Sequence, residues 1–330
     1  MAILVTGGAG YIGSHMVLAL CDAGEEVVVL DDLSTGVRAN VDARARFVRG
    51  DVSDPLIVMR LVAEHEIRAV VHFAAKVVVP DSVADPLDYY LANTAKTRAL
   101  LAAVTAAHVP HFVFSSTAAV YGDVSQEPVS EDTPAVPVSP YGASKLMSEW
   151  MLRDSAAAYG LKYVALRYFN VAGADPLGRT GQSTPRATHL IKVACEAATG
   201  KRTGMQVFGT DYPTRDGTCI RDYIHVSDLV SAHLDALDYL RRGGGSEVMN
   251  CGYGAGYSVL DVVETVKRVS GVDFPVTIAP ARPGDPASIV ARADRIRQTL
   301  GWKPKHDNLE TIVRHALAWE RKLPASSVAA

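Results

Sequence analysis

The sequence predicts a doubly wound α/β protein built on a parallel sheet, with a smaller mixed α/β lobe. Short apolar runs rich in β-branched residues alternate with helical patterns through the first half of the chain. These runs lack polar–apolar alternation, so both faces of each strand should be covered by helices. A glycine-rich turn follows the first run and leads into a helix, which is typical of a Rossmann domain.

The expected elements follow from these runs in order. Of two strongly patterned helices, the first covers roughly 86–108 and is rich in Ala and Leu. The second covers roughly 140–158; Ser139 is a plausible N-cap, Pro140 suits the first turn, and Gly160 ends the helix. The expected strands are 3–6, 26–31, 46–51, 69–75, 111–116 and 164–170.

Beyond residue 170 the regular alternation stops. Residues 171–190 are rich in Gly, Pro and Thr and are expected to form a long loop. We expect residues 1–170, with a returning segment at about 219–250, to form the Rossmann domain. Residues 171–218 and 251–330 should form the second lobe, with the functional site in the cleft between lobes. The later expected elements are helices at 188–199, 258–269 and 308–321, strands at 205–208 and 248–252, and a strand turning into a helix from residue 221.

Composition restricts the partners. The chain has 330 residues, 48% of them hydrophobic, and a net charge of −3, which gives no reason to expect nucleic acid. Its four cysteines form no CxxC pair, and no apolar run is long enough to span a bilayer. We therefore expect a soluble cytoplasmic protein with no membrane partner and no metal site.

The segment TGGAGYIG (6–13) predicts a dinucleotide site. Gly7, Gly10 and Gly13 would allow a tight turn, close approach of a pyrophosphate and packing of the helix on the strand. Asp31 ends the second strand, where a carboxylate accepts from a ribose 2′-hydroxyl and repels a 2′-phosphate, so NAD is favoured over NADP. Asp51 and Val52 end the third strand; they either lie against the adenine, or Asp51 caps the next helix.

Chemistry is indicated by VSPYGASK (138–145). Tyr141 and Lys145 are four residues apart, so on a helix they share a face. A nearby ammonium and a positively charged nicotinamide would lower the pKa of Tyr141 and make it a base. Thr117, at the end of HFVFSST, could hydrogen-bond the same substrate hydroxyl. These three residues are the expected catalytic set.

The motifs TGGAGYIG, HFAA, SSTAAVYG, YGASK, LRYFN and RDYIHVSDL occur in an order and spacing that resemble the extended short-chain dehydrogenase/reductase family. The resemblance covers nearly the whole chain and is closer still to its UDP-glucose (UDP-galactose) 4-epimerases. It implies that bound NAD is retained, that Tyr141 takes the proton of the sugar 4-hydroxyl while hydride leaves C4, and that the 4-keto sugar turns over before the hydride returns. Thr117 would orient the hydroxyl and Lys145 would hold the nicotinamide ribose.

The resemblance also implies further contacts. A homodimer is expected, with the helices at 86–108 and 140–158 paired across subunits. Residues similar to family cofactor contacts are Tyr11 and Ile12 at the pyrophosphate turn, Phe73 and Ala74 along the cofactor, Asn93 as a buttress, and Phe169 over the nicotinamide. Residues similar to UDP-sugar contacts are Asn170, His189, Phe208 beside uracil, Arg221 and Arg282 at the diphosphate, and Asp285 at the uridine ribose.

Several positions depart from the family pattern. Thr117 replaces the usual Ser but keeps the hydroxyl, and His189 replaces an Asn seen in many relatives. Lys76 lies one place from a cofactor-contacting Lys of some relatives, and gapless alignment puts Val77 there. Ile289 occupies the position that screens the sugar 2-substituent. Its intermediate size leaves N-acetylated substrates open.

Three classes of function compete. They are a 4-epimerase, of glucose-type, N-acetylated or both kinds of UDP-sugar; a nucleotide-sugar dehydratase; and a binding module that uses NAD as a ligand only. A dehydratase needs a proton relay after Thr117, where this chain has Ala118 and Ala119. A binding module would not need Tyr141 and Lys145. The residues therefore favour the epimerase.

Overall fold

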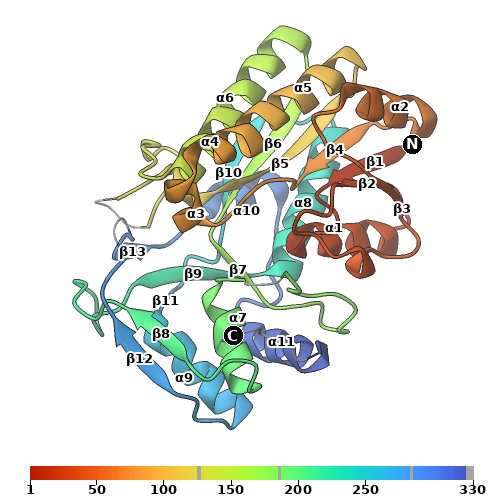
Figure 1. Ribbon diagram of the computed structural model, residues 1–330. Coiled ribbons are helices and arrows are strands. Elements are labelled where there is room, and N and C mark those ends of the chain that lie inside the picture. Colours follow the sequence, from red (N-terminus) through yellow and green to blue (C-terminus); the bar gives the residue numbers. More distant parts are fainter. Residues whose placement is uncertain (125–127, 185–186, 283–284, 325–330) are drawn as a thin grey trace.

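The computed structural model describes residues 1–124, 128–184, 187–282 and 285–324. Its main sheet has seven strands, all parallel, in the order β10-β6-β5-β4-β1-β2-β3 (Figure 1). The order reverses direction between β1 and β4, so their carboxyl ends form a crevice for a ligand. The strands are β1 Ala2–Thr6, β2 Glu26–Asp31, β3 Arg46–Arg49, β4 Ala69–His72, β5 His111–Thr117, β6 Lys162–Tyr168 and β10 Glu247–Cys251.

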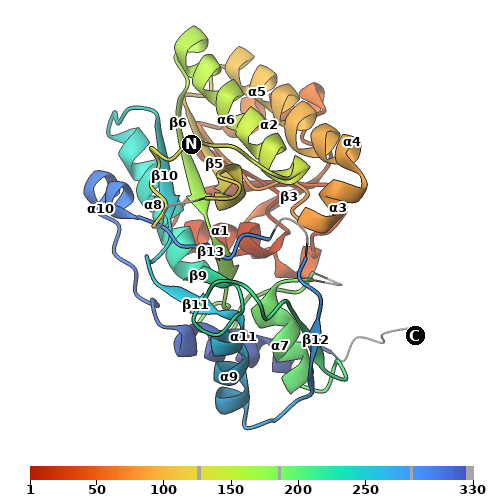
Figure 2. The same ribbon diagram turned by 90° about the vertical axis from the view of Figure 1, so that its left-hand side faces the viewer.

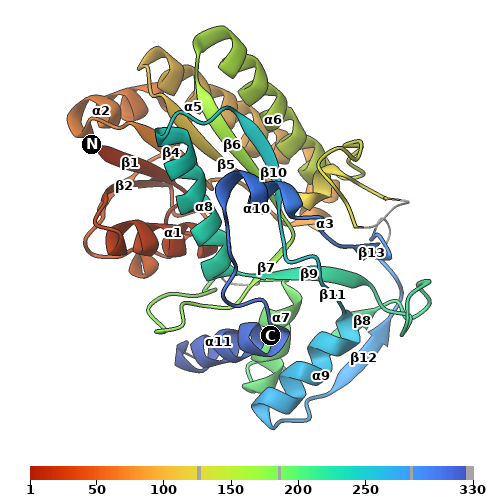
Figure 3. The ribbon, with the colours of Figure 1, turned by 180° about the vertical axis from the view of Figure 1, so that it is seen from behind.

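Helices cover both faces of this sheet, which confirms the doubly wound fold (Figure 3). Alternate residues of each strand enter opposite cores: Ile3 and Val5 face one layer, and Leu4 faces the other. The first layer contains α1 (Tyr11–Asp22), α8 (Val226–Arg241) and α10 (Asp294–Leu300). The second contains α2 (Pro55–His65), α5 (Lys96–Ala106) and α6 (Pro140–Tyr159), with α3 (Val79–Ala84) and α4 (Pro86–Tyr89) alongside α6.

The expected helix at 86–108 is helical but not uniform. Between α4 and α5 the backbone forms a π-helical segment, η2 (Tyr90–Ala95). Such segments are rare and often lie at functional sites. Asn93 is in this segment, and its side chain is buried. The other expected helix is confirmed as α6: the Ser139 hydroxyl accepts from the Gly142 amide, and Gly160 ends the helix in a left-handed conformation.

The expected strand at 164–170 is in fact two strands in different sheets. β6 ends at Tyr168, and β7 (Asn170–Ala172) pairs with β9 (Ile220–His225) in the second lobe. Phe169 is the single residue between them. Apolar character alone cannot reveal such a change of sheet, because both strands are buried. The expected loop at 171–190 therefore begins with a strand.

The second lobe lies below the carboxyl edge of the main sheet (Figure 2). One small sheet has the path β11-β9-β13, with β7 on β9; the other pairs β8 with β12. Within 219–250, β9 joins the small sheet, whereas α8 and β10 join the Rossmann part. The elements are α7 Leu190–Ala198, β8 Met205–Phe208, β11 Gly256–Ser258, α9 Val259–Ser270, β12 Val276–Ala279, β13 Ser288–Ile289 and α11 Leu309–Lys322; the short 3₁₀ helices η1 Arg38–Asn40 and η3 Ala118–Val120 complete the fold.

Among the described residues, no helix has both the length and the apolar character that a membrane span requires.

Candidate active site

The glycine turn after β1 leaves no room for side chains. Gly7 has a positive φ of 70°, and a Cβ there would lie 2.5 Å from the backbone nitrogen of Ala74. A Cβ on Gly13 would lie 2.1 Å from the Gly7 carbonyl oxygen, so the start of α1 packs directly on the turn. Gly10 is the N-cap of α1 and offers no side-chain cap. The first amides of α1 are therefore open to an anionic group such as a pyrophosphate.

Asp31 lies beside this turn and is buried. Its carboxylate accepts from the Ala9 amide at 2.9 Å and from the Leu33 amide at 2.8 Å. Burial raises the pKa of Asp31, and these two hydrogen bonds oppose that effect. The carboxylate thus braces the turn, and each of its oxygens keeps a further lone pair for a ribose hydroxyl. Together with the glycine cradle and the uncapped helix, this set fits NAD.

Asp51 does not cap the next helix. The cap of α2 is Asp54, whose side chain accepts from Leu56 and Ile57. Asp51 instead accepts from Ser53 and forms an ion pair with Lys96 on α5. This excludes the helix-cap interpretation of Asp51.

Thr117, Tyr141 and Lys145 are brought together where β5 ends beside the first turns of α6. All three are buried. The Thr117 hydroxyl lies close enough to the Tyr141 phenol to lower its pKa, and it accepts from the Ala119 amide at 3.1 Å. Lys145 donates from Nζ to the Ser115 carbonyl at 2.7 Å and lies over the Phe114 ring. The i, i+4 spacing on α6 thus directs both side chains to the end of the strand.

Burial dominates the pKa values of Tyr141 and Lys145 in the protein alone. The pKa of Tyr141 is raised to about 12, mainly by burial; the nearby Thr117 hydroxyl lowers it and the charge of Tyr89 raises it. The expectation that Lys145 and a positively charged nicotinamide lower the pKa of Tyr141 concerns the protein with its cofactor bound, and it stays a prediction. Burial lowers the pKa of Lys145 itself to about 7, and the charge of Glu149 opposes this. The physical reason is desolvation, which disfavours both charged forms.

Asn93 joins the helix α6 to the loop after β4. Its amide oxygen accepts from the Lys76 amide at 2.8 Å, and its nitrogen donates to the Lys76 carbonyl and the Ser144 hydroxyl. That loop begins with Phe73 and Ala74, which approach the glycine turn. The Lys76 ammonium itself points to Asp88 in an exposed ion pair.

Phe169 and Ile289 lie in one apolar cluster with Ala118, although they come from distant parts of the chain. Ile289 is only 7% exposed. Because Ala118 directly follows Thr117, this cluster forms an apolar wall next to the catalytic candidates. The alanine methyl groups on this wall cannot transfer protons.

The candidate sugar-nucleotide contacts in the second lobe fall into smaller groups. Arg221 pairs in register with Ile289 on β13, and its guanidinium lies 3.9 Å from the Asp285 carboxylate. The Arg282 guanidinium stacks on the Phe208 ring, 3.7 Å from its centroid. Thus the Arg282 side chain occupies one face of the ring expected beside uracil.

The remaining expected residues have other partners. Asn170 on β7 pairs in register with Tyr223 on β9. His189 is exposed at the start of α7, with Gln182 as its neighbour at 3.5 Å. Tyr11 reaches from α1 to the Gly173 carbonyl at 2.7 Å, next to Ile12 in the first turn. Val52 is buried in the core.

The histidines at 72 and 225 have structural partners. His72 bonds to the hydroxyls of Thr6 and Thr97, and His225 accepts from the Ser227 amide and contacts His315. In the part of the chain that the structure describes, no group of His, Cys, Asp and Glu is arranged to hold a metal ion.

Sequence reasoning missed polar residues behind the catalytic candidates. Ser115 supplies the carbonyl that Lys145 contacts, and its hydroxyl bonds to the Tyr168 phenol. Glu149 lies one turn beyond Lys145 and forms a buried ion pair with Arg167 on β6. The signal available for Glu149 was its spacing of four residues from Lys145, on the same helix face.

The fold and the site together define the class of protein: an enzyme of the short-chain dehydrogenase/reductase type, with a dinucleotide cradle and a Tyr–Lys pair at the carboxyl edge of a Rossmann sheet. The chain belongs to the NAD dependent epimerase/dehydratase family, whose model matches residues 3–252. It is 60% identical over 324 residues to a UDP-glucose 4-epimerase of Azospirillum brasilense, covering 98% of this chain and 93% of that protein.

Solved structures agree with this assignment. The UDP-glucose 4-epimerase of Brucella ovis, solved in complex with NAD, is 42% identical and superposes with a TM-score of 0.93, covering 96% of this chain and 97% of that one. The UDP-Glc/GlcNAc 4-epimerase of Campylobacter jejuni is 48% identical, with a TM-score of 0.85, covering 98% of this chain and 99% of that one.

Proposed function

We propose that the protein interconverts UDP-glucose and UDP-galactose at C4 through a transient 4-keto sugar, and that it retains its NAD throughout. The observation that carries this proposal is the grouping of Thr117, Tyr141 and Lys145 next to an apolar wall that includes Ala118, whose methyl group cannot relay a proton. The similarity to named UDP-glucose 4-epimerases supports the same substrate.

In this proposal the Rossmann part binds NAD. The cradle of Gly7, Gly10 and Gly13 with the start of α1 holds the pyrophosphate, and Asp31 holds the adenosine ribose. Asp51, Val52, Phe73, Ala74 and Phe169 line the rest of the cofactor, and Asn93 supports the loop that carries Phe73. NAD, when bound, supplies reversible oxidation at the sugar C4.

The chain's own residues manage the proton. Tyr141 removes the proton from the sugar 4-hydroxyl and later returns it, while Thr117 orients that hydroxyl. Burial keeps the pKa of Tyr141 near 12 in the protein alone, so the phenolate needs a positive charge beside it. The ammonium of Lys145 is held at the Ser115 carbonyl and would supply part of that charge.

The second lobe binds the UDP moiety. Arg221 and Arg282 provide guanidinium groups for the diphosphate, with Asn170 and His189 near them. Phe208 lies beside the uracil and Asp285 accepts from the uridine ribose. Because Arg282 stacks on Phe208 in the protein alone, we expect the Arg282 side chain to move when the nucleotide binds.

The same fold offers a second candidate substrate class. The similarity to a UDP-Glc/GlcNAc 4-epimerase favours activity on N-acetylated UDP-hexoses as well, and the intermediate size of Ile289 leaves room for either class. NMR of the purified protein with each of the four UDP-hexoses tests both candidates. Interconversion without a ketone or dehydrated product is expected, whereas a 4-keto-6-deoxy product would identify a dehydratase. No conversion after NAD is added back would favour a binding module.

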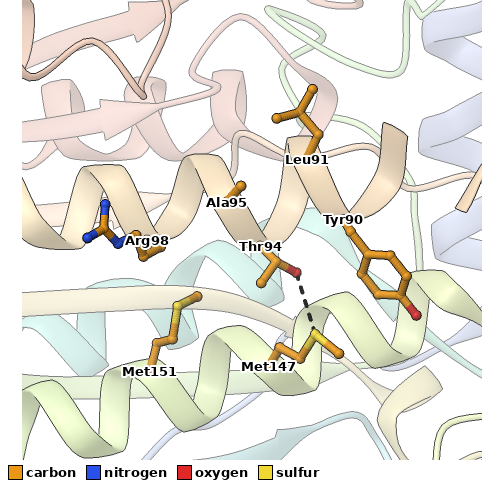
Figure 4. A pocket seen from close by; sticks show the side chains of 7 residues that line it. All are labelled: Tyr90, Leu91, Thr94, Ala95, Arg98, Met147 and Met151. Carbon is orange, nitrogen blue, oxygen red and sulfur yellow. Dashed lines mark hydrogen bonds between the residues drawn. The ribbon is translucent and has the colours of Figure 1, made fainter. Parts of the chain in front are cut away.

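We also propose a cytoplasmic homodimer. The four cysteines are buried free thiols, which suits a reducing compartment. Figure 4 shows an apolar groove between η2–α5 and α6, lined by Tyr90, Leu91, Thr94, Ala95 and Arg98 from the first helix and by Met147 and Met151 from α6. Leu87 is 77% exposed beside this groove and Trp150 is 49% exposed. Such an apolar surface on paired helices suits packing against the same helices of a second copy.

A further inference from the structure

A buried ion pair lies behind the catalytic candidates. Glu149 on α6 and Arg167 on β6 are 4% and 7% exposed. Arg167 binds the carboxylate in a bidentate manner, from Nη2 to Oε2 at 2.6 Å and from Nε to Oε1 at 2.9 Å. The Ser116 hydroxyl donates a third hydrogen bond to Oε1. The carboxylate is therefore satisfied inside the protein and has no need of solvent.

One side of this pair leads to the catalytic residues. Ser116 directly precedes Thr117 on β5, so its bond to Glu149 fixes the end of the strand against α6. Glu149 also follows Tyr141 and Lys145 at intervals of four residues, and the three side chains share one face of α6. The pair thus joins the two elements whose relative position sets the contact between Thr117 and Tyr141.

The other side of the pair leads to the substrate lobe. Arg167 donates from Nη1 to the Tyr121 phenol at 3.1 Å, and that phenol donates to the Asn250 side chain at 2.6 Å. Asn250 in turn donates to the Val129 carbonyl, and Val129 exchanges backbone hydrogen bonds with Val290 and Arg292. These residues directly follow Ile289, so the network ends on the segment that forms the apolar wall.

Stability alone does not explain this arrangement. Removing two charges from water costs free energy that their attraction only partly offsets, and apolar residues of similar volume often replace such pairs with no loss of stability. The network connects β5, α6, β6, β10 and the segment after Ile289. Its hydrogen bonds therefore fix the positions of these elements relative to one another, and this points to a role beyond stability.

We propose that Glu149 and Arg167 are positioning residues. They hold the Thr117–Tyr141 contact at a fixed position relative to the apolar wall that contains Ile289. This inference rests on the proposed epimerase function. The two residues act through Ser116 and Tyr121, without touching the substrate. If this relative position is lost, the rate of proton transfer falls more than the substrate affinity, since a displacement of about 1 Å can cost on the order of 100-fold in rate.

The test replaces the pair by apolar residues of similar volume, in the double variant Glu149→Leu/Arg167→Met. We expect it to fold and to retain NAD, with a KM for UDP-galactose within roughly threefold of wild type and a kcat lowered at least about tenfold. A second variant, Ser116→Ala, keeps the ion pair and removes only its link to the strand; we expect a roughly fivefold lower kcat. Ser116→Ala decides the question if the double variant does not fold.

A matched control is Asp228→Asn on α8. Asp228 is another buried carboxylate, which accepts from the Tyr253 phenol and from two backbone amides, and none of its partners belongs to the candidate active site. We expect it to lower the melting temperature without changing kcat. Wild-type kcat in the double variant and in Ser116→Ala would overturn the inference, as would an equal fall in kcat in the control. Absence of epimerisation in the wild-type protein would instead overturn the proposed function.

Discussion

The Lys145 ammonium donates a 2.7 Å hydrogen bond to the backbone carbonyl of Ser115, two residues before Thr117 on the same strand. This contact anchors the first half of α6 to the end of β5, because it crosses from the helix to the strand at the level of the catalytic candidates. It also places the ammonium in a buried setting, over the Phe114 ring. The first two predictions concern Lys145 and Tyr141, which lies one turn earlier on α6.

Tyr141→Phe should abolish interconversion and leave the protein folded with NAD bound. The substitution removes the proton acceptor and keeps the ring that packs, so kcat should fall by about 100- to 10,000-fold. The assay couples UDP-glucose formation from UDP-galactose to a dehydrogenase, and absorbance of the purified protein reports NAD. Turnover near the wild-type rate would contradict the assignment of Tyr141 as the base.

Lys145→Met should change how stability depends on pH. Burial lowers the pKa of Lys145 to about 7 in the folded protein, below its unfolded value of about 10.4, so the unfolded chain binds more protons between these two pH values. The free energy of unfolding of the wild type should therefore rise, relative to Lys145→Met, as the pH increases from about 7 to 10. Each tenfold difference in proton affinity between the folded and unfolded chains corresponds to about 1.4 kcal/mol. Urea unfolding of cofactor-stripped protein measures this, and a pH-independent difference would contradict it.

Gly13→Ala should lower the amount of NAD that the protein retains. A Cβ there would lie 2.1 Å from the Gly7 carbonyl, so the turn must deform and NAD occupancy should fall at least about tenfold. The matched control is Gly24→Ala, where φ is 78° and no atom lies within 4 Å of the added Cβ. The control should lose about 1 kcal/mol of stability through its backbone and keep its NAD. Equal NAD loss in both variants would show that destabilisation, not the cradle, is responsible.

Ile289 should set the substrate range. Ile289→Tyr should lower kcat/KM for UDP-N-acetylglucosamine relative to UDP-glucose by about tenfold, since a larger side chain excludes the acetamido group. Ile289→Gly should change the ratio in the opposite direction. Both ratios come from the same NMR assay. Identical ratios in the wild type and both variants would remove Ile289 from the sugar site.

Met151→Glu should dissociate the proposed dimer. The new carboxylate lies in the apolar groove of Figure 4 and would be buried without a partner on association. The control Leu177→Glu lies in a loop, where Leu177 is 74% exposed. Sedimentation velocity should give monomers for the first variant and dimers for the wild type and the control. A wild type that sediments as a monomer would refute the dimer itself.

Local chemistry predicted much of the fold. The limits of β2 and β8 match the expected runs, and the caps of α6 at Ser139 and Gly160 were predicted from their residue types. Errors arose where tertiary pairing decides. The run 164–170 divides at Phe169 because its two halves find partners in different sheets. Asp54, not Asp51, caps α2, although both follow the strand closely.

In the candidate site too, local features could be predicted from the sequence and features that depend on tertiary contacts could not. The glycine turn and the Tyr141–Lys145 pair were identified from spacing, because contacts within one turn or one helix follow from local geometry. The pKa of Tyr141 could not be predicted, because its burial depends on surrounding elements. Nor could the stacking of Arg282 on Phe208, which joins residues 74 positions apart in the sequence.

By itself, the sequence determined the class of fold, the dinucleotide turn and the candidate reactive side chains, since each is encoded within a few neighbouring residues. Only the tertiary structure decided that Ala118, Phe169 and Ile289 form one wall and that Glu149 and Arg167 form one buried pair. The physical reason is that burial and electrostatics depend on which distant segments pack together. The stretch SSTAAVYG supplied the hydroxyl of Thr117, and the fold joined the neighbouring Ser116 to the buried pair of Glu149 and Arg167.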